Sequence, residues 1–312
     1  MVVRRFCFMS NNHTILIVPE NIEDSLTSFL LAKDASNECV SRSLQLYKHC
    51  IKKLIVYLKT NDIFLMEKIT TDILREFFLG LKEKHNEGGV HHIYRPIKAF
   101  FIWYWDEFEL ETRNPISKIK MKPPKLKPKP GVPLHDLELM IEVCKTELKQ
   151  RDKAILLCLL DSAARATEFC EIRVGDVNLI TGHVQLNVTK GDKIRSVRFG
   201  SRALRMLRRY LKTRGFITSG SPLFASDTGE KLDRFSLRLM VDRRADNAGV
   251  HRPGLHDFRR RCAYEMLKKK VPTKMVSEYL GHANVTVTER YLAIVNDDVL
   301  DAHKDSAPAD YM

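Results

Sequence analysis

Residues 254–291 read GLHDFRRRCAYEMLKKKVPTKMVSEYLGHANVTVTERY, and this stretch decides how the rest of the chain is interpreted. His256 and Arg259 are three residues apart, so on a helix they lie on one face. His282 follows Arg259 by 23 residues, and Tyr291 follows His282 by nine. Arginine can bind two phosphate oxygens with its planar fork, histidine transfers protons near neutral pH, and tyrosine supplies a nucleophilic oxygen. Core packing does not require these residue types in this order, so the stretch predicts chemistry on a phosphodiester.

The composition is that of a basic globular protein. The chain has 312 residues, enough for two domains, and 44% of them are hydrophobic. The formal net charge is +13 and the pI is about 9.4. Such a charge favours a polyanionic partner, with nucleic acid as the first candidate and an anionic membrane surface as the second.

The cysteines and apolar runs indicate the compartment. The seven cysteines include no C-x-x-C pair, which argues against a zinc ribbon or a disulfide framework and favours a reducing environment. The apolar run near the N-terminus is too short for a signal peptide, and the longest run, 154–160, is too short for a membrane span. We therefore expect a cytoplasmic protein without a membrane partner.

The first part of the chain predicts a small helical bundle. Residues 1–22 show no periodicity and are interpreted as an extension, whereas residues 23–117 carry helical patterns. We expect four helices: one near 23–32, one with an apolar stripe over 40–58, one capped by Thr70 or Thr71, and one over 90–108. Gly88-Gly89 is expected to separate the last two. The aromatic row FFIWYWDEF at 100–108 suits base stacking, but its helical spacing favours core packing.

A basic linker follows at residues 118–133. Residues 118–129, KIKMKPPKLKPK, contain six lysines, and the prolines prevent a helix. The segment is either a plain solvated linker or an extended strap whose lysines follow a phosphate backbone. We favour the second interpretation, which makes DNA contacts of Lys120, Lys122, Lys125 and Lys127.

The second domain is expected to be mainly helical with a small β-hairpin. The patterns predict helices over 134–147, 152–163, 202–213 and 234–247, and a hairpin over 183–199 around a KGDK turn. Arg165 follows the apolar helix, where a cation is costly unless an anion or the carboxylate of Glu168 meets it. Lys190 lies at the hairpin tip and by itself is an ordinary turn lysine. The helix over 234–247 presents either a solvated face or a DNA-binding face, with four candidate contacts: Arg234, Arg238, Arg243 and Arg244.

Taken together, these residues resemble the tyrosine site-specific recombinases of the phage integrase family, in the two-domain architecture of its Xer-like members. The motifs are S-A-A-R-A-T-E with Arg165, T-K-G-D-K-I-R with Lys190, H-D-F-R with His256 and Arg259, L-G-H with His282, and Tyr291. The resemblance extends over about residues 22–300, since a helical bundle ending in R-N-P-I and followed by a basic linker resembles the family's SAM-like core-binding domain. Ala164 departs from the family's usual leucine, and Arg260 from a frequent histidine.

The resemblance implies a mechanism. Arg165 and Arg259 would neutralise the phosphate, Tyr291 would form a 3′-phosphotyrosine, and Lys190 would protonate the departing 5′-oxygen. His256 would deprotonate the tyrosine or hold the phosphate, and His282 would donate to a phosphate oxygen. No metal, ATP or other cofactor is implied. The implied partner is double-stranded DNA, bound by the helix over 234–247 in its major groove.

The resemblance also implies an assembly and a domain plan. The protein would be a homotetramer on synapsed DNA sites and a monomer or dimer when free. Its catalytic domain would cover residues 134–295, and a tail, 296–312, would dock on a neighbouring subunit.

Three other functions remain open. A metal-dependent nuclease could use His256, Asp257 and His282 as ligands, although an acidic cluster suited to magnesium is lacking in the sequence. A type IB topoisomerase-like enzyme would share the chemistry and only relax supercoils. A DNA-binding relative without activity would keep the fold. The DNA site also remains open, and the tail and first motif favour a mobile element over chromosome resolution.

Overall fold

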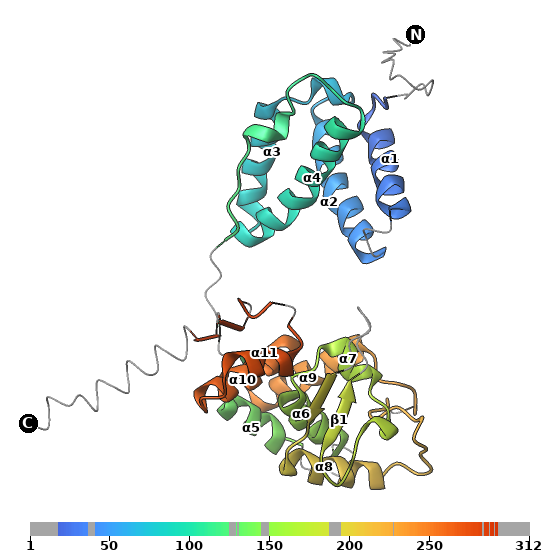
Figure 1. The fold of residues 1–312 in the computed structure, drawn as a ribbon, viewed down its shortest axis with the longest axis vertical. Coiled ribbons are helices and arrows are strands. Elements are labelled where there is room, and N and C mark those ends of the chain that lie inside the picture. The colour runs from blue at the N-terminus through green and yellow to red at the C-terminus, as the bar shows by residue number, and fades with distance from the viewer. Residues whose placement is uncertain are drawn as a thin grey trace, which may run out of the picture. The chain divides into compact units, whose positions relative to one another are not determined.

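The computed structural model describes residues 18–36, 41–124, 129, 131–144, 150–186, 195–226, 228–282, 284–286, 288–289 and 291–292. The chain divides into two compact units, residues 1–126 and 127–312, and the division falls inside the Pro/Lys-rich segment (Figure 1). Each unit has its own apolar core. Within the described ranges, no helix is long and apolar enough to cross a membrane.

The first unit is a helical bundle, as the periodicity predicts. Its helices are α1 (Ile22–Ala35), α2 (Ser41–Thr60), α3 (Thr71–Lys84) and α4 (Glu87–Glu107), with 3-10 turns at Met66–Lys68 and Pro115–Lys118. Side-chain caps start three of them: Asn21 accepts from the Glu23 amide, Thr70 from Ile73 and Asn86 from Gly89. These caps satisfy amides that the first helical turn leaves without partners.

The aromatic row of α4 is core. Phe100 and Phe101 are fully buried and Tyr104 is 3% exposed. Phe100 meets Phe29 of α1 edge to face, with ring centroids 5.5 Å apart. The expectation of core packing over base stacking is therefore confirmed for these three rings.

The expected break at Gly88-Gly89 was wrong. Both glycines lie in the first turn of α4, and the preceding interruption falls at His85-Asn86. Asn86 decides the position because its side-chain oxygen accepts from the Gly89 amide at 2.9 Å, which starts the helix before the glycines.

The second unit is mainly helical with one two-stranded antiparallel sheet. Its elements are α5 (Leu134–Glu142), α6 (Gln150–Ser162), α7 (Ala166–Glu171), a 3-10 turn at Val174–Asp176, β1 (His183–Leu186), β2 (Arg195–Arg198), α8 (Ser201–Lys212), α9 (Arg234–Ala248), α10 (Leu255–Lys268) and α11 (Thr273–Leu280). Val184 faces Val197 across the sheet, and both are buried. The fold class predicted from sequence is confirmed, although α5 ends five residues before its predicted end.

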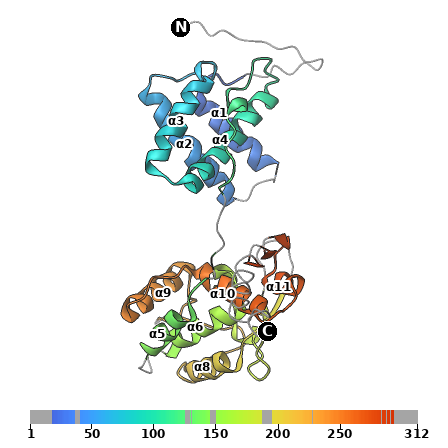
Figure 2. The same ribbon diagram turned by 90° about the vertical axis from the view of Figure 1, so that its left-hand side faces the viewer.

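Helix α6 is the centre of the second unit. It packs against α8 and α10, and its apolar residues are buried nearly all round, as its sequence predicts. In Figure 2, α6 lies between α8 and α10. Helix α6 ends at Ser162, and from there the chain turns toward α7, α10 and α11.

Candidate active site

Arg165 is fixed at the start of α7. Ala163, directly after α6, adopts a left-handed backbone conformation with φ 48°, which redirects the chain. Arg165 is the N-cap of α7: its amide donates to Glu168 Oε2 at 2.9 Å and its Nη1 to Oε1 at 2.5 Å. The ion pair with Glu168 therefore exists, yet 43% of the Arg165 side chain stays exposed. Donors that do not face the carboxylate can still meet an anion.

Helix α10 carries His256 and Arg259. Arg259 is 2% exposed and donates Nη1 to the Ala163 carbonyl at 2.8 Å and Nη2 to the Leu280 carbonyl at 2.5 Å. His256, one turn earlier, is exposed. Arg259 thus joins the end of α6 to the end of α11.

The C-terminal end of α11 is held by three arginines from three elements. The consecutive carbonyls of Tyr279, Leu280 and Gly281 each accept a hydrogen bond from a different guanidinium. We call the donors the arginine cluster: Arg195 of β2, Arg259 of α10 and Arg165 at the start of α7. The last carbonyls of a helix have no intrahelical donors and carry the negative end of its dipole, which is why cations gather there.

A single carboxylate, that of Glu168, accepts hydrogen bonds from this cluster. Glu168 is 3% exposed and receives Arg195 Nη2 at 2.7 Å in addition to both bonds from Arg165. Burial alone would raise its pKa, but the hydrogen bonds from the Arg165 amide and the two guanidinium groups outweigh burial and lower the pKa. Three cations therefore share one anion, and the region keeps an excess of positive charge.

The excess charge is visible in the neighbouring groups. The pKa of Arg259 is lowered to about 10, first by burial and then by Arg165 and Arg195, while Tyr291 acts in the opposite direction. The pKa of His282 is lowered to about 4 by burial, then by Arg259, Arg165 and His256. Partial burial and then Arg259 also lower the pKa of His256. Burial and the arginine cluster thus disfavour the protonated form of both histidines.

His282 and Tyr291 complete the group. His282 directly follows Gly281, whose left-handed conformation ends α11, and its Nδ1 lies 2.9 Å from the hydroxyl of the buried Thr288. Tyr291 is 8% exposed and packs in a cluster with Ala163, residues of α10 and residues of α11. Tyr291 is close enough to Arg259 for their charges to interact.

The structure thus brings together five of the six residues that the sequence predicts for catalysis: Arg165, His256, Arg259, His282 and Tyr291. The sixth, Lys190, lies outside the described residues. The sequence interpretation missed Arg195 and Thr288. Arg195 could have been found from strand alternation, because it shares a face with the buried Val197 and an arginine on the inner face of a strand needs a partner.

The candidate DNA contacts divide into three groups. Lys120, Lys122, Arg234 and Arg243 are exposed. Arg238 is half-buried and donates to Asp242 and to the Pro253 carbonyl, and Arg244 is 11% exposed and pairs with the buried Asp152. Lys125 and Lys127 lie outside the described residues. Arg244 is therefore directed into the unit, unlike its neighbour Arg243.

The nuclease alternative fails at Asp257. Its Oδ2 accepts from the Gly254 amide at 2.7 Å and its Oδ1 from Arg260 Nη1 at 2.7 Å, so it caps α10. In the described part of the chain, no group of three or more His, Cys, Asp or Glu side chains is placed to hold a metal ion.

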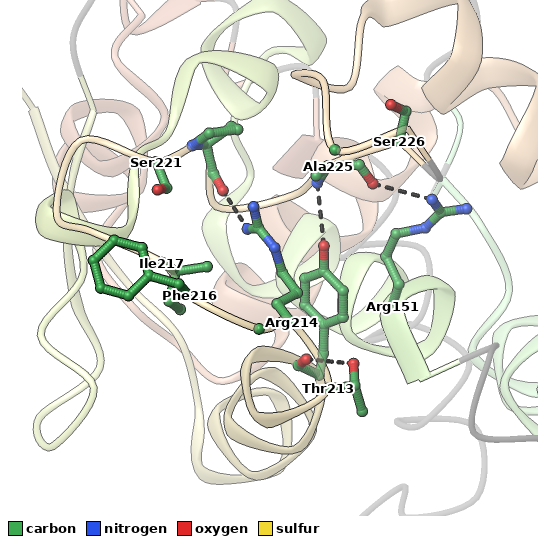
Figure 3. A pocket seen from close by; sticks show the side chains of 12 residues that line it. Arg151, Thr213, Arg214, Phe216, Ile217, Ser221, Ala225 and Ser226 are labelled. Carbon is green, nitrogen blue, oxygen red and sulfur yellow. Dashed lines mark hydrogen bonds between the residues drawn. The ribbon is translucent and has the colours of Figure 1, made fainter.

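A cavity of about 610 Å³ lies elsewhere in the second unit, beside the turn at residues 213–229 (Figure 3). Both of its arginines donate to backbone carbonyls: Arg151 Nη1 to Ala225 at 3.0 Å, and Arg214 Nη1 to Pro222 at 2.5 Å. None of the five clustered catalytic candidates lines it. The chemistry therefore favours the arginine cluster over this cavity as the functional site.

Comparison with known proteins finds similar sequences. The family model described as "Phage integrase family" matches residues 132–297. A tyrosine recombinase XerC of Pelobacter propionicus is 30% identical over 298 residues, covering 91% of this chain and 95% of the relative.

Solved structures share the fold. A lambda integrase (75–356) dimer bound to a COC′ core site has a TM-score of 0.71 at 16% identity, covering 86% of this chain and 97% of the other. XerH recombinase bound to palindromic difH in a post-cleavage complex has a TM-score of 0.69 at 19% identity, covering 89% and 82%.

Proposed function

The chain belongs to the phage integrase family and is a tyrosine site-specific recombinase, and from this premise we propose that Tyr291 is the nucleophile and that Arg165 and Arg259 bind the scissile phosphate of double-stranded DNA. The observation that carries the proposal is the arginine cluster beside Tyr291, with three guanidinium groups and one carboxylate. Tyr291 Oη attacks phosphorus, the bond to the 5′-oxygen breaks, and a 3′-phosphotyrosine forms. Attack by another strand's 5′-hydroxyl reverses the step and completes strand exchange.

The charge of the site matches this transition state. A phosphodiester attacked by a phenolate gains a second negative charge, and preorganised donors stabilise it without reorganising. The excess of guanidinium charge over Glu168 supplies the opposite sign. Arg165 and Arg259 are already held close together, because each donates a hydrogen bond to a carbonyl of the Leu280-Gly281 turn.

The histidines act as neutral groups. With a pKa of about 4, His282 is uncharged at neutral pH. Its Nδ1 lies 2.9 Å from the Thr288 hydroxyl, and we assign the tautomer in which Nδ1 accepts this hydrogen bond and Nε2 carries the proton. Nε2 then donates to a non-bridging phosphate oxygen. His256, whose pKa is also lowered, is uncharged as well and can accept the tyrosine proton. Lys190 is assigned the proton transfer to the 5′-oxygen, because lysine is protonated at neutral pH.

Contact with DNA must uncover part of the site. Arg165 and His256 are exposed, whereas Arg259 is 2% and Tyr291 8% exposed. Tyr291 cannot attack a phosphate while it is packed in its apolar cluster. We therefore infer that DNA binding moves the segment that carries Tyr291 and, with it, exposes Arg259.

Helix α9 is assigned to the DNA groove beside the scissile phosphate. It lies next to the start of α10, because Arg238 donates to the Pro253 carbonyl, two residues before Leu255. Its exposed side chains include Arg234 and Arg243 as well as Phe235 and Leu239, which are 68% and 41% exposed. Arginine and apolar side chains at a groove read guanine edges and thymine methyl groups. Exposed Lys120 and Lys122 of the linker add phosphate contacts.

The domain plan and the assembly follow from the same reaction. We assign residues 23–117 to the core-binding domain, residues 134–295 to the catalytic domain and the tail 296–312, which lies outside the described residues, to docking on a neighbouring subunit. Exchange between two duplexes breaks four strands, and each tyrosine holds one strand end, so the active assembly on DNA is a homotetramer. The protein works where its DNA lies, at the nucleoid in the cytoplasm.

A nicked suicide substrate tests the chemistry. DNA carrying the core site, taken from sequence flanking the gene, is incubated with wild type and with Tyr291→Phe in excess EDTA. We expect a protein–DNA adduct that survives denaturation for wild type and none for the variant. Cleavage without an adduct would assign the attack to water, and tight binding without cleavage would indicate a DNA-binding protein that lacks activity.

A further inference from the structure

Arg195 joins parts of the site that lie far apart in the sequence. Its side chain is 9% exposed, and it donates Nη2 to Glu168 Oε2 at 2.7 Å and Nη1 to the Tyr279 carbonyl. It thereby connects the start of β2 with α7 and with the end of α11. Its Nε has no hydrogen-bond partner among the described residues.

Arg195 also packs against the turn that presents His282. A Cβ built on Gly281 would lie 2.8 Å from Arg195 Cδ and 3.2 Å from Nε, and Gly281 has a φ of +65°. The Arg195 side chain thus packs against the face of the turn, and the left-handed conformation of Gly281 favours glycine at this position. The position of His282 depends on this contact, because His282 follows Gly281 directly.

Glu168 extends the effect of Arg195 to the phosphate-binding arginine. The same carboxylate accepts Arg195 on Oε2 and Arg165 on Oε1, so its orientation is fixed from both sides. Without Arg195, Glu168 would be buried with one guanidinium partner, and Arg165 would lose the fixed anchor that sets the direction of its exposed donors.

We propose that Arg195 is a positioning residue for strand cleavage, which holds Arg165 through Glu168 and His282 through the end of α11 without itself touching DNA. The inference rests on the proposed function of the site. It adds a seventh residue to the six that the sequence predicts and gives strand β2 a role besides forming the hairpin whose expected tip carries Lys190.

Lysine is the informative replacement at this position. Arg195→Lys keeps the charge, but an ammonium group cannot bridge Glu168 and the Tyr279 carbonyl with a planar fork. A misplacement of about 1 Å at reacting groups costs about 10²-fold in rate, and we expect single-turnover cleavage to fall by about that factor. DNA affinity should stay within about threefold, because the side chain makes no phosphate contact.

Arg198→Lys is the matched control. Arg198 lies three residues further along the same strand, is exposed, and donates to the Thr181 carbonyl at 2.9 Å. We expect wild-type cleavage for this variant. Thermal unfolding of both variants separates lost positioning from lost folding, and Glu168→Gln provides a second measurement if Arg195→Lys is unstable. Since both changes act on one ion pair, the double variant should be no slower than the slower single variant.

A substrate with sulfur in place of the 5′-bridging oxygen identifies which partner Arg195 serves. A thiolate leaves without a general acid, so this substrate should restore cleavage by Lys190→Ala. It should not restore Arg195→Lys, whose defect lies at the phosphate-binding groups. If this substrate restored cleavage by Arg195→Lys, Arg195 would be shown to position the general acid Lys190. That result would overturn its assignment to Arg165 and His282.

The two proposals fail differently. Cleavage by Arg195→Lys at the wild-type rate, with no adduct from Tyr291→Phe, would remove only the positioning role. A parallel loss of DNA affinity and cleavage in Arg195→Lys would also overturn the positioning role, because such a loss would show that Arg195 contacts DNA. An adduct formed by Tyr291→Phe would remove the proposed function itself.

Discussion

The two compact units bury different kinds of side chain. In the described part of the first unit, the buried residues are apolar or aromatic, apart from Ser25. The second unit buries Asp152, Glu168 and Arg259, and the last two belong to the arginine cluster. Burying a charge is unfavourable unless it is paired and hydrogen-bonded. Burial in the first unit is therefore explained by folding alone, whereas two of the buried charges of the second unit belong to the site that we propose binds a phosphate.

The largest effect on folding is expected in the first unit. Phe100→Ala removes a fully buried ring that contacts Phe29, and such a change costs about 3–5 kcal/mol of unfolding free energy. Hydrogen exchange should quicken in peptides of residues 18–124 and stay unchanged in peptides of the second unit. Equal acceleration in both would show that the units do not fold separately and would weaken the comparison.

The largest effect on chemistry is expected at Arg259. Arg259→Lys keeps the charge but loses the pair of bonds to the Ala163 and Leu280 carbonyls. Loss of one donor that stabilises transition-state charge costs about 10²–10³-fold in rate, and we expect single-turnover cleavage to fall by that much. Lys98→Arg, a charge-conserving change in the first unit, serves as control. Wild-type cleavage by Arg259→Lys would assign Arg259 to folding alone.

The pH dependence of stability should differ between the units. The pKa of His282 is about 4 in the folded state and near 6.5 when unfolded, so folding favours the neutral ring. Its contribution is present above about pH 6.5 and is lost as the pH falls toward 4. His282→Gln should therefore reduce the acid sensitivity of the second unit between these values. Identical pH profiles for variant and wild type would contradict the electrostatic role given to the arginine cluster.

The smallest effect is expected at Ala163. The left-handed conformation of Ala163 costs about 1–2 kcal/mol of conformational free energy, which Ala163→Gly removes. The same change loses the burial of one methyl group, which stabilises the fold by about 0.8 kcal/mol. The net change in unfolding free energy should stay within about 1 kcal/mol. Ala163→Val, which adds a branched side chain to the same fully buried position, should be clearly destabilised. Tolerance of valine would show that the turn before Arg165 is not as constrained as its geometry indicates.

Local patterns predicted the elements better than their junctions. The apolar stripes and caps located α2, α3, α6 and α9, because periodicity and capping are properties of neighbouring residues. The same reasoning misplaced the start of α4, where Asn86 overrides two glycines. It also extended α5 beyond Glu142.

The candidate catalytic residues were predictable as residue types, but the network of bonds that holds them was not. Motif spacing identified Arg165, His256, Arg259, His282 and Tyr291, yet it says nothing of the carbonyls that hold them. The bonds at the end of α11 join residues 21, 84 and 116 positions apart, which only the tertiary fold brings together. Arg195 was missed for this reason, since its partners Glu168 and Tyr279 lie far from it in the sequence.

The most direct test of the account is to locate the covalent bond. The adduct from the nicked substrate is denatured, the DNA is digested to a residual nucleotide, and the protein is cleaved with trypsin for mass spectrometry. The account predicts the nucleotide on the peptide of residues 291–304, which begins with Tyr291 and contains no other tyrosine. A nucleotide on the preceding peptide, residues 275–290, would make Tyr279 the nucleophile and contradict the account. In the structure the Tyr279 hydroxyl donates a hydrogen bond to the Asp161 carbonyl.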